Sequence, residues 1–293
     1  MSYRDKSLIT VLLPVADEKY LEATLKSIEE QSLPDELFDL LVVNDGMSGD
    51  LINKVVNRAY SKLNVKIIDS DKHGIVGALN TGLLHCNTKY IARIDQDDLM
   101  LKDRLKIQLE YLEANKQVLC VGGQLQLIDD KDNSIGFSYY PKSSWLIKKS
   151  SYLSSPMAHP AVMFRRNSVM SLGGYREGIP EDWDLWMRLL ETGRIENLDK
   201  VIIKYRIHGN QLSRTKMYQS NSARGLIRIS ANLRIIGAKD CPEAGEETEI
   251  WMQRNILLGQ ANSDSWKLLL WQVIRMLNSK KIKLIYQSKK DYK

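Results

Sequence analysis

Short apolar runs alternate with helical patterns through the first hundred residues, and this alternation limits the possible folds more than any other feature of the chain. The predicted strands cover 8–13, where Pro14 closes the run, then 38–43, 65–68 and 90–94. The predicted helices between them cover 20–32, 51–61 and 75–85. Strands that alternate with helices form a parallel sheet with helices on both faces. We therefore expect an α/β fold with a mostly parallel central sheet covered by helices on both faces.

The second part of the chain is less regular and suggests a boundary. Helical patterns cover 104–114 and 183–191, and strand patterns cover 118–128 and 201–206. After about residue 213 the pattern becomes mainly helical. We expect one α/β domain over 1–213 and a C-terminal helical extension over 214–293.

Composition and cysteine usage favour a globular protein of the cytoplasm. Hydrophobic residues make up 43% and charged residues 27% of the chain, which is ordinary for a protein with a buried core. Cys86, Cys120 and Cys241 are far apart and form no CxxC pair, which argues against a disulfide framework and a zinc site. The apolar run before Pro14 is too short for a signal peptide, and no run approaches the roughly 18 apolar residues of a membrane span.

The positive charge is concentrated at the C-terminus. From Ser265 onward eight Lys or Arg oppose one Asp, so this tail carries +7 and the rest of the chain −1. Apolar residues from Trp266 to Leu277 recur at helical spacing. The tail is therefore either a helix packed on the enzyme's own core or an interfacial helix on an anionic membrane surface. The charge of the remaining chain argues against nucleic-acid binding.

An acidic cluster follows the fourth predicted strand. Asp95, Asp97 and Asp98 would repel one another unless they are solvated or neutralised by a cation. Oxygen ligands suit Mg²⁺ or Mn²⁺, which often complete their shell with substrate phosphates. One interpretation is a divalent cation bound to a nucleotide diphosphate; the other is a solvated turn that caps the next helix. Asp45, at the end of a neighbouring strand, favours the first, although an Asp-Gly pair alone usually marks only a turn.

Two further sites carry the same ambiguity. Glu181 and Asp182 precede a helical pattern, where acidic residues either take part in chemistry or stabilise the helix N-terminus. His208 is either a ligand or, as is more common for a lone histidine, a structural residue.

An ordered set of short motifs over roughly 8–213 resembles glycosyltransferase family 2. The blocks that carry the resemblance are 9–14, 25–32, 41–46, 78–82, 93–98, 104–108, 159–165, 173–175, 181–188 and 205–208. Each block alone is weak, whereas the ordered set is specific.

The resemblance implies a GT-A fold, an inverting reaction, Mn²⁺ or Mg²⁺ as cofactor, and a nucleotide-diphosphate sugar as donor, a UDP-sugar by expectation. It places the nucleotide-sugar half at about 1–98 and the acceptor half at about 99–213. The implied acceptor is a glycan or a lipid-linked sugar in surface polysaccharide biosynthesis, which suggests a cytoplasmic enzyme that is peripheral on the inner face of the membrane.

The resemblance also assigns roles to single residues. Asp182 matches the catalytic base, and Asp97, with His208, matches the metal site. The nucleotide-sugar side comprises Pro14, Asp45, Arg93, Asp95 and Asp97, and the acceptor or diphosphate side comprises His159, Glu181 and Arg206. Two departures weaken the base-binding assignment: Ala16-Asp17 stands where members often have Tyr-Asn, and Asn44 replaces the first Asp of an Asp-Asp-Gly motif.

Three other classes of protein compete with this interpretation. A metal-dependent nucleotidyltransferase would also use paired carboxylates, but it typically has a glycine-rich or basic phosphate loop where this chain has the acidic segment 14–18. A Rossmann dehydrogenase is disfavoured because no GxGxxG follows the first strand. A non-catalytic sugar-binding protein of the same fold is disfavoured because both Asp97 and Asp182 are present.

Overall fold

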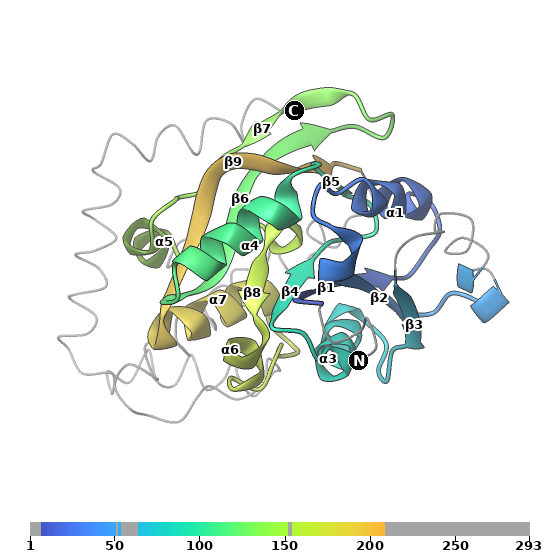
Figure 1. Ribbon diagram of the computed structural model, residues 1–293, viewed down its shortest axis with the longest axis horizontal. Helices are drawn as coiled ribbons and strands as arrows, with labels where there is room; N and C mark the ends of the chain where they lie inside the picture. Colours follow the sequence, from blue (N-terminus) through green and yellow to red (C-terminus); the bar gives the residue numbers. More distant parts are fainter. Residues whose placement is uncertain (1–6, 51, 54–63, 152–153, 209–293) are drawn as a thin grey trace, which may run out of the picture. The chain divides into compact units, whose positions relative to one another are not determined.

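The computed structural model describes residues 7–50, 52–53, 64–151 and 154–208 (Figure 1). In this part of the chain nine strands form one sheet in the order β3-β2-β1-β4-β8-β6-β9-β5, and β7 pairs with β6 outside this path. The strands are β1 (Ile9–Val15), β2 (Phe38–Asn44), β3 (Val65–Asp69), β4 (Tyr90–Arg93), β5 (Leu99–Met100), β6 (Val118–Ile128), β7 (Ser134–Ser138), β8 (Met163–Arg165) and β9 (Arg194–Arg206). The helices are α1 (Leu21–Glu29), α3 (Ile75–His85), α4 (Arg104–Ala114), α5 (Ser144–Ser150), α6 (Arg166–Met170) and α7 (Glu181–Thr192), with short 3-10 turns η2 (Asp35–Leu37) and η3 (His159–Ala161).

The half of the sheet that precedes residue 98 is parallel throughout. β1 pairs in parallel with β2 and β4, and β2 pairs in parallel with β3. The second half is mixed, because β8 is antiparallel to both β4 and β6 while β9 is parallel to β6. The expected α/β class is confirmed, and the carboxyl ends of β1, β2 and β4 share one edge.

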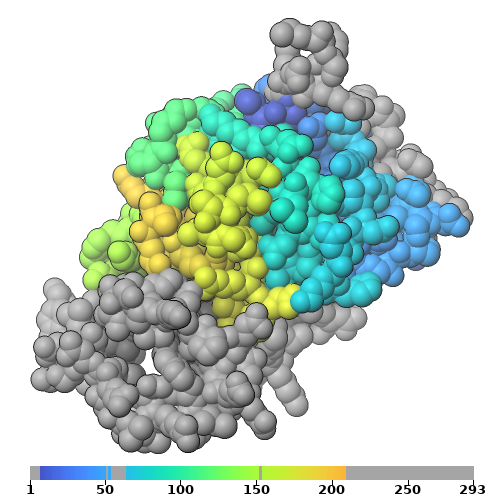
Figure 2. Space-filling model, turned by 90° about the horizontal axis from the view of Figure 1, so that it is seen from below, coloured from blue at the N-terminus to red at the C-terminus, as the bar shows by residue number. Residues whose placement is uncertain are grey.

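Helices cover both faces of this sheet, as expected. Val11 and Leu13 of β1 belong to a core with α1 and α4, whereas Leu12, between them, packs in a second core with α3 and α7. This alternation is the two-residue period of a strand buried on both sides. In Figure 2 the cyan surface around α3 and the yellow surface around residues 160–190 meet without a gap.

The structure differs from the predicted elements mainly at strand ends. β1 continues through Pro14 to Val15, because β4 pairs with β1 only as far as Leu12 and Pro14 therefore borders β2 alone. A proline is tolerated where one side of the strand is unpaired. β9 begins at Arg194, seven residues earlier than the predicted strand at 201–206.

Some predicted segments lie outside the described residues, including most of the helix predicted at 51–61 and the whole extension 214–293 with its basic tail. Among the helices that the structure does describe, none combines the length and the hydropathy required to cross a bilayer.

Candidate active site

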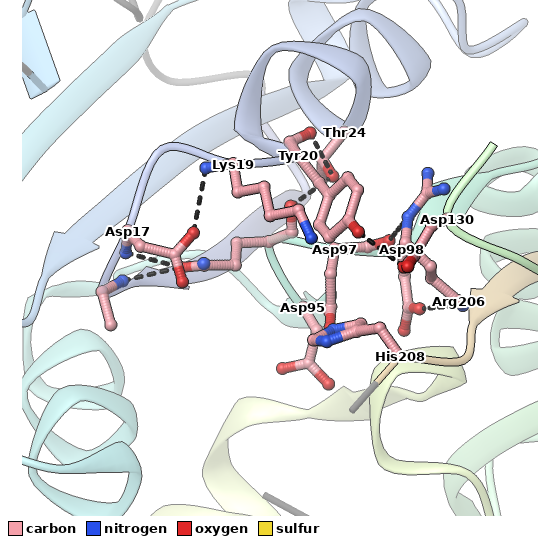
Figure 3. Close-up of polar contacts among 12 residues, drawn as sticks. Asp17, Lys19, Tyr20, Thr24, Asp95, Asp97, Asp98, Asp130, Arg206 and His208 are labelled. Atoms are coloured by element: carbon pink, nitrogen blue, oxygen red, sulfur yellow. Dashed lines mark hydrogen bonds and ion pairs between the residues drawn. The ribbon is translucent and has the colours of Figure 1, made fainter. Parts of the chain in front are cut away.

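The acidic turn after β4 brings three carboxylates together. Ligand oxygens of Asp95, Asp97 and Asp98 all lie within 4.8 Å of one another (Figure 3). The turn is closed by the N–H of Asp98, which donates to the carbonyl of Asp95 at 3.3 Å. The cluster predicted from the sequence therefore exists as a compact group at the carboxyl edge of the parallel strands.

Each of these carboxylates has a different partner. The guanidinium of buried Arg93 donates to Asp95 at 2.6 Å through Nη1 and also pairs with it through Nη2. Nε2 of His208 lies 2.7 Å from Oδ2 of Asp97. Asp98 is fully buried, and its Oδ1 accepts the backbone N–H of Arg206 at 2.9 Å.

The surroundings of Asp98 fit a divalent cation close by. Burial, together with the charges of Asp97 and Asp95, holds the pKa of Asp98 well above its usual range. Its Oδ2 is buried and accepts no hydrogen bond among the described residues. Carboxylate oxygens with one imidazole nitrogen are ligands that Mg²⁺ and Mn²⁺ accept. A cation would offset both the mutual repulsion and the unpartnered oxygen, so the residues present fit such an ion.

The end of β2 places Asp45 on the same edge of the sheet. Both carboxylate oxygens of Asp45 accept the N–H of Gly74, the N-cap residue of α3, at 3.0 Å, and Nδ1 of His73 lies 3.4 Å from Oδ1 of Asp45. Pro14 is buried at the end of the neighbouring strand β1. The structure therefore brings the predicted nucleotide-side residues to adjacent strand ends, with Asp45 anchored to the start of α3.

Gln96 is a functional candidate that the sequence reasoning passed over. Its Oε1 accepts the N–H groups of Ala16 at 2.6 Å and Asp17 at 3.3 Å, and its carbonyl accepts the hydroxyl of Thr24 at 2.7 Å. The loop after β1 is thus attached to the acidic turn. Its position between two aspartates is the signal that could have identified it.

Asp182 lies in the first turn of α7, and the N-cap position is occupied by Pro180, which makes no side-chain cap hydrogen bond. The hydroxyl of Ser155 donates to Asp182 at 3.0 Å. Burial, and then the charge of Glu181, raises the pKa of Asp182, and the hydrogen bond from Ser155 offsets part of this rise. A carboxyl group with a raised pKa is a better proton acceptor once ionised than an ordinary aspartate, which suits a general base.

His159 joins the two carboxylate groups electrostatically. It is buried, with Nε2 3.0 Å from the hydroxyl of Tyr175 and Nδ1 3.5 Å from Glu181. Burial, then the charge of Arg93, lowers the pKa of His159 to about 3, while Asp182 and Asp95 act in the opposite direction. His159 is therefore neutral near pH 7; it contacts Glu181 at the start of α7, and its pKa responds to Arg93 and Asp95 at the acidic turn.

The Gly173-Gly174-Tyr175 segment is held by Asn80 of helix α3 and by Arg188 of helix α7. Asn80 donates to the carbonyl of Tyr175 and accepts its N–H, both at 2.9 Å. Arg188 donates to the carbonyls of Leu172 at 3.0 Å and Gly174 at 2.8 Å. The motif blocks at 78–82 and 181–188 therefore include residues that hold the Gly173-Gly174-Tyr175 segment in place, a role that sequence spacing does not reveal.

Arg206 crosses from the end of β9 to the turn between β6 and β7. Its Nε donates to the carbonyl of Asp97 at 3.0 Å, its Nη1 donates to the carbonyl of Asp129 at 2.9 Å, and its Nη2 pairs with Asp132 at 2.6 Å. The structure thus places Arg206 against the acidic turn. His208, which was predicted as a metal ligand, contacts Asp97 of this acidic turn.

Comparisons with known proteins agree with this geometry. Glycosyl transferase family 2 matches residues 10–173. The O-antigen biosynthesis glycosyltransferase WbnJ of Escherichia coli is 31% identical over 224 residues, 74% of this chain and 86% of that protein. A UDP-Gal:alpha-D-GlcNAc-diphosphoundecaprenol beta-1,3-galactosyltransferase of Escherichia coli is 29% identical over 191 residues, 64% of this chain and 68% of that protein.

Two solved structures show the same fold. S. aureus TarS in complex with UDP-GlcNAc superposes with a TM-score of 0.57 at 18% identity, covering 77% of this chain and 72% of that one. The mannosyltransferase PcManGT from Pyrobaculum calidifontis, in complex with GDP-Man and Mn²⁺, superposes with a TM-score of 0.58 at 15% identity, covering 94% and 82%.

Proposed function

Since the chain belongs to glycosyltransferase family 2 and has a GT-A fold, we propose that it transfers a sugar, with inversion, from a nucleotide-diphosphate sugar to an acceptor hydroxyl. One observation carries the proposal: two carboxylate groups occupy one site in different surroundings. The acidic turn is a compact cluster suited to a cation, whereas Asp182 accepts a hydroxyl hydrogen bond and has a raised pKa. Such separation is expected when one group neutralises a leaving group and the other accepts a proton.

The donor would bind at the carboxyl edge of the parallel strands. Asp45 would contact the base and Asp95 the ribose, with Pro14 and Arg93 shaping the same pocket; ligands of open α/β sheets bind at this edge. Arg93 orients Asp95 through the paired contacts described above. We propose a UDP-sugar, because the Escherichia coli relative is named for UDP-Gal and TarS binds UDP-GlcNAc.

Asp97 and His208 would hold the divalent cation, with Asp95 and Asp98 beside it. When bound, Mn²⁺ or Mg²⁺ supplies positive charge that stabilises the departing diphosphate. PcManGT, which shares the fold, was solved with Mn²⁺. His159, Glu181 and Arg206 would form the acceptor and diphosphate side of the site.

Asp182 would act as the general base. The acceptor oxygen attacks the anomeric carbon from the face opposite the nucleoside diphosphate, and Asp182 takes the hydroxyl proton as the new C–O bond forms. The bond from the anomeric carbon to the diphosphate breaks in the same step. An α-linked donor would therefore give a β-linked product.

The acceptor would be a glycan or a lipid-linked sugar in surface polysaccharide synthesis, which the names of the two Escherichia coli relatives support. In this proposal the enzyme works on the cytoplasmic face of the membrane, attached through its basic tail. Co-sedimentation of the full-length protein with anionic vesicles tests the attachment. Replacing Lys280, Lys281 and Lys283 by Gln should prevent the protein from sedimenting with the vesicles at low salt. Unchanged binding of this variant would remove the tail from the proposal.

The central experiment is a panel of nucleotide sugars tested for transfer or hydrolysis with Mn²⁺ present. Asp97→Asn should abolish both activity and Mn²⁺ binding with the fold intact. Asp182→Asn should keep donor binding but lower turnover by roughly 10² to 10⁴-fold. Asp199→Asn, at an exposed residue paired with Lys142, is the matched control and should behave like wild type. Full activity in excess chelator would remove the metal from the mechanism.

A further inference from the structure

Tyr20 lies at the centre of the contacts drawn in Figure 3. It is the last residue before α1 and therefore ends the loop that follows β1. Its hydroxyl donates a 2.7 Å hydrogen bond to Oδ1 of Asp130, 110 residues further along the chain, in the turn between β6 and β7. One side chain thus joins the loop at the nucleotide edge to a turn of the other half of the sheet.

The ring of Tyr20 contacts the last residue of β9, Arg206, and a residue just beyond the strand, His208. The guanidinium carbon of Arg206 is 4.3 Å from the ring centroid. The imidazole of His208 is 5.5 Å away between centroids, tilted by 46°. Arg206 is almost completely buried, and a cation over an aromatic ring gains most when both are removed from water.

Both of these neighbours hold the acidic turn. His208 lies on the carboxylate of Asp97, while Arg206 binds the carbonyl of Asp97 and, through its own N–H, the carboxylate of Asp98. Tyr20 therefore acts on the acidic turn through its neighbours.

The other end of the same loop is attached to the acidic turn by Gln96, through the N–H groups of Ala16 and Asp17. The loop is thus fixed to the turn at both ends, by an amide at its start and an aromatic ring at its end. At this end of the loop the ring of Tyr20 lies beside the imidazole of His208, which also contacts Asp97.

We propose that Tyr20 is a positioning residue for the cation site: its ring fixes the imidazole of His208 against Asp97 and its hydroxyl fixes the turn that carries Asp130. This inference rests on the proposed function, because it requires Asp97 and His208 to hold a divalent cation. Residues that orient metal ligands without touching the metal typically change affinity by about 10 to 100-fold when they are replaced.

The test is direct Mn²⁺ binding to the full-length protein, measured from the electron paramagnetic resonance signal of free Mn²⁺. Tyr20→Ala and Tyr20→Leu remove the ring and should weaken binding about tenfold or more. Tyr20→Phe keeps the ring and should stay within about threefold of wild type. Tyr139→Ala, at an exposed tyrosine of another surface, is the matched control and should bind Mn²⁺ like wild type.

A second readout separates positioning from general damage. In the donor assay, raising the Mn²⁺ concentration should restore the turnover of Tyr20→Leu, and its circular dichroism spectrum should match wild type. Wild-type Mn²⁺ affinity in both Tyr20→Leu and Tyr20→Ala would overturn the inference while leaving the proposed function intact, provided that Asp97→Asn has lost binding. Wild-type affinity in Asp97→Asn as well would overturn the cation site itself.

Discussion

The side-chain amide of Asn44 donates a 2.8 Å hydrogen bond to Oδ1 of Asp69, joining the ends of β2 and β3. The same amide donates to the carbonyl of Met47 at 3.0 Å, and Oδ1 of Asn44 accepts the N–H of Met47 at 2.9 Å. A carboxylate at position 44 could accept but not donate. The departure from an Asp-Asp-Gly motif therefore has a local reason: the partner across the sheet is already an aspartate.

Asn44→Asp should lower the free energy of unfolding by about 1 to 2 kcal/mol at neutral pH, because two donated hydrogen bonds are lost and two carboxylates meet. Urea unfolding monitored by circular dichroism measures the change. Adding Asp69→Asn should recover most of the loss, since an amide at 69 can again pair with position 44. Equal stability of Asn44→Asp and wild type would show that the contact contributes nothing.

Local patterns predicted the elements whose periodicity is strong. The helices at 75–85 and 104–114 and the strand at 118–128 have the predicted bounds. β9 was predicted too short, because residues 194–200 include polar positions whose strand conformation comes from pairing with β6. β5 and β8, of two and three residues, are too short to leave a periodic signal.

The acidic cluster could be predicted from the sequence, whereas the contacts that surround it could not. Three carboxylates close together in sequence are visible in the chain itself, as is their place after a strand. The contacts of Asn80 with Tyr175 and of Tyr20 with Asp130 join residues 95 and 110 positions apart. Such pairs depend on the final packing of the sheet, so a single sequence carries no local signal for them.

The pH dependence of transfer should reflect the raised pKa of Asp182. A general base works as the carboxylate, so activity should fall as the pH drops through this pKa, at a higher pH than an ordinary aspartate would give. Ser155→Ala removes a hydrogen bond that favours the carboxylate, so it should move the acid limb of kcat/KM to still higher pH. Ser171→Ala removes a hydroxyl that donates to the carbonyl of Ser168, away from Asp182 in the sequence, and should leave the limb in place. An acid limb that is the same in Ser155→Ala as in wild type would argue against Asp182 as the base.

His159 should make the fold less stable in acid. Its pKa is about 3 in the folded protein and roughly 6.5 in the unfolded chain. Between these values the unfolded state binds a proton that the folded state does not, so stability falls as the pH falls, by up to about 1.4 kcal/mol per pH unit. Glutamine does not titrate, so His159→Gln should lose less unfolding free energy than wild type between pH 7 and pH 4. Urea unfolding at several pH values measures this difference. Parallel pH curves for the two proteins would contradict a buried neutral histidine.

Gly174 should not tolerate a side chain, and comparison with Gly173 separates the effect of steric contact from the effect of backbone conformation. Both Gly173 and Gly174 have positive φ, at 80° and 73°. A Cβ at 174 would lie 2.5 Å from Oδ1 of Asn80, whereas a Cβ at 173 meets nothing within 4 Å. Gly174→Ala should therefore destabilise the protein by about 1 to 3 kcal/mol more than Gly173→Ala, measured by thermal melting. In an Asn80→Ala background, Gly174→Ala and Gly173→Ala should differ less in stability, because the side-chain oxygen that a Cβ at 174 would meet is gone.

The pairing of β4 with β8 has a consequence for substrate exchange. It makes strands β1 to β4 and the later strands β6, β8 and β9 parts of one hydrogen-bonded sheet, and Asn80 of α3 joins the two halves again at Tyr175. Moving these two halves apart would require breaking the β4–β8 ladder. In the proposed reaction, entry of the donor and exit of the nucleotide would therefore depend on the loops at the rim of the sheet. The rate of those steps should respond to loop substitutions and remain insensitive to changes in the buried strands.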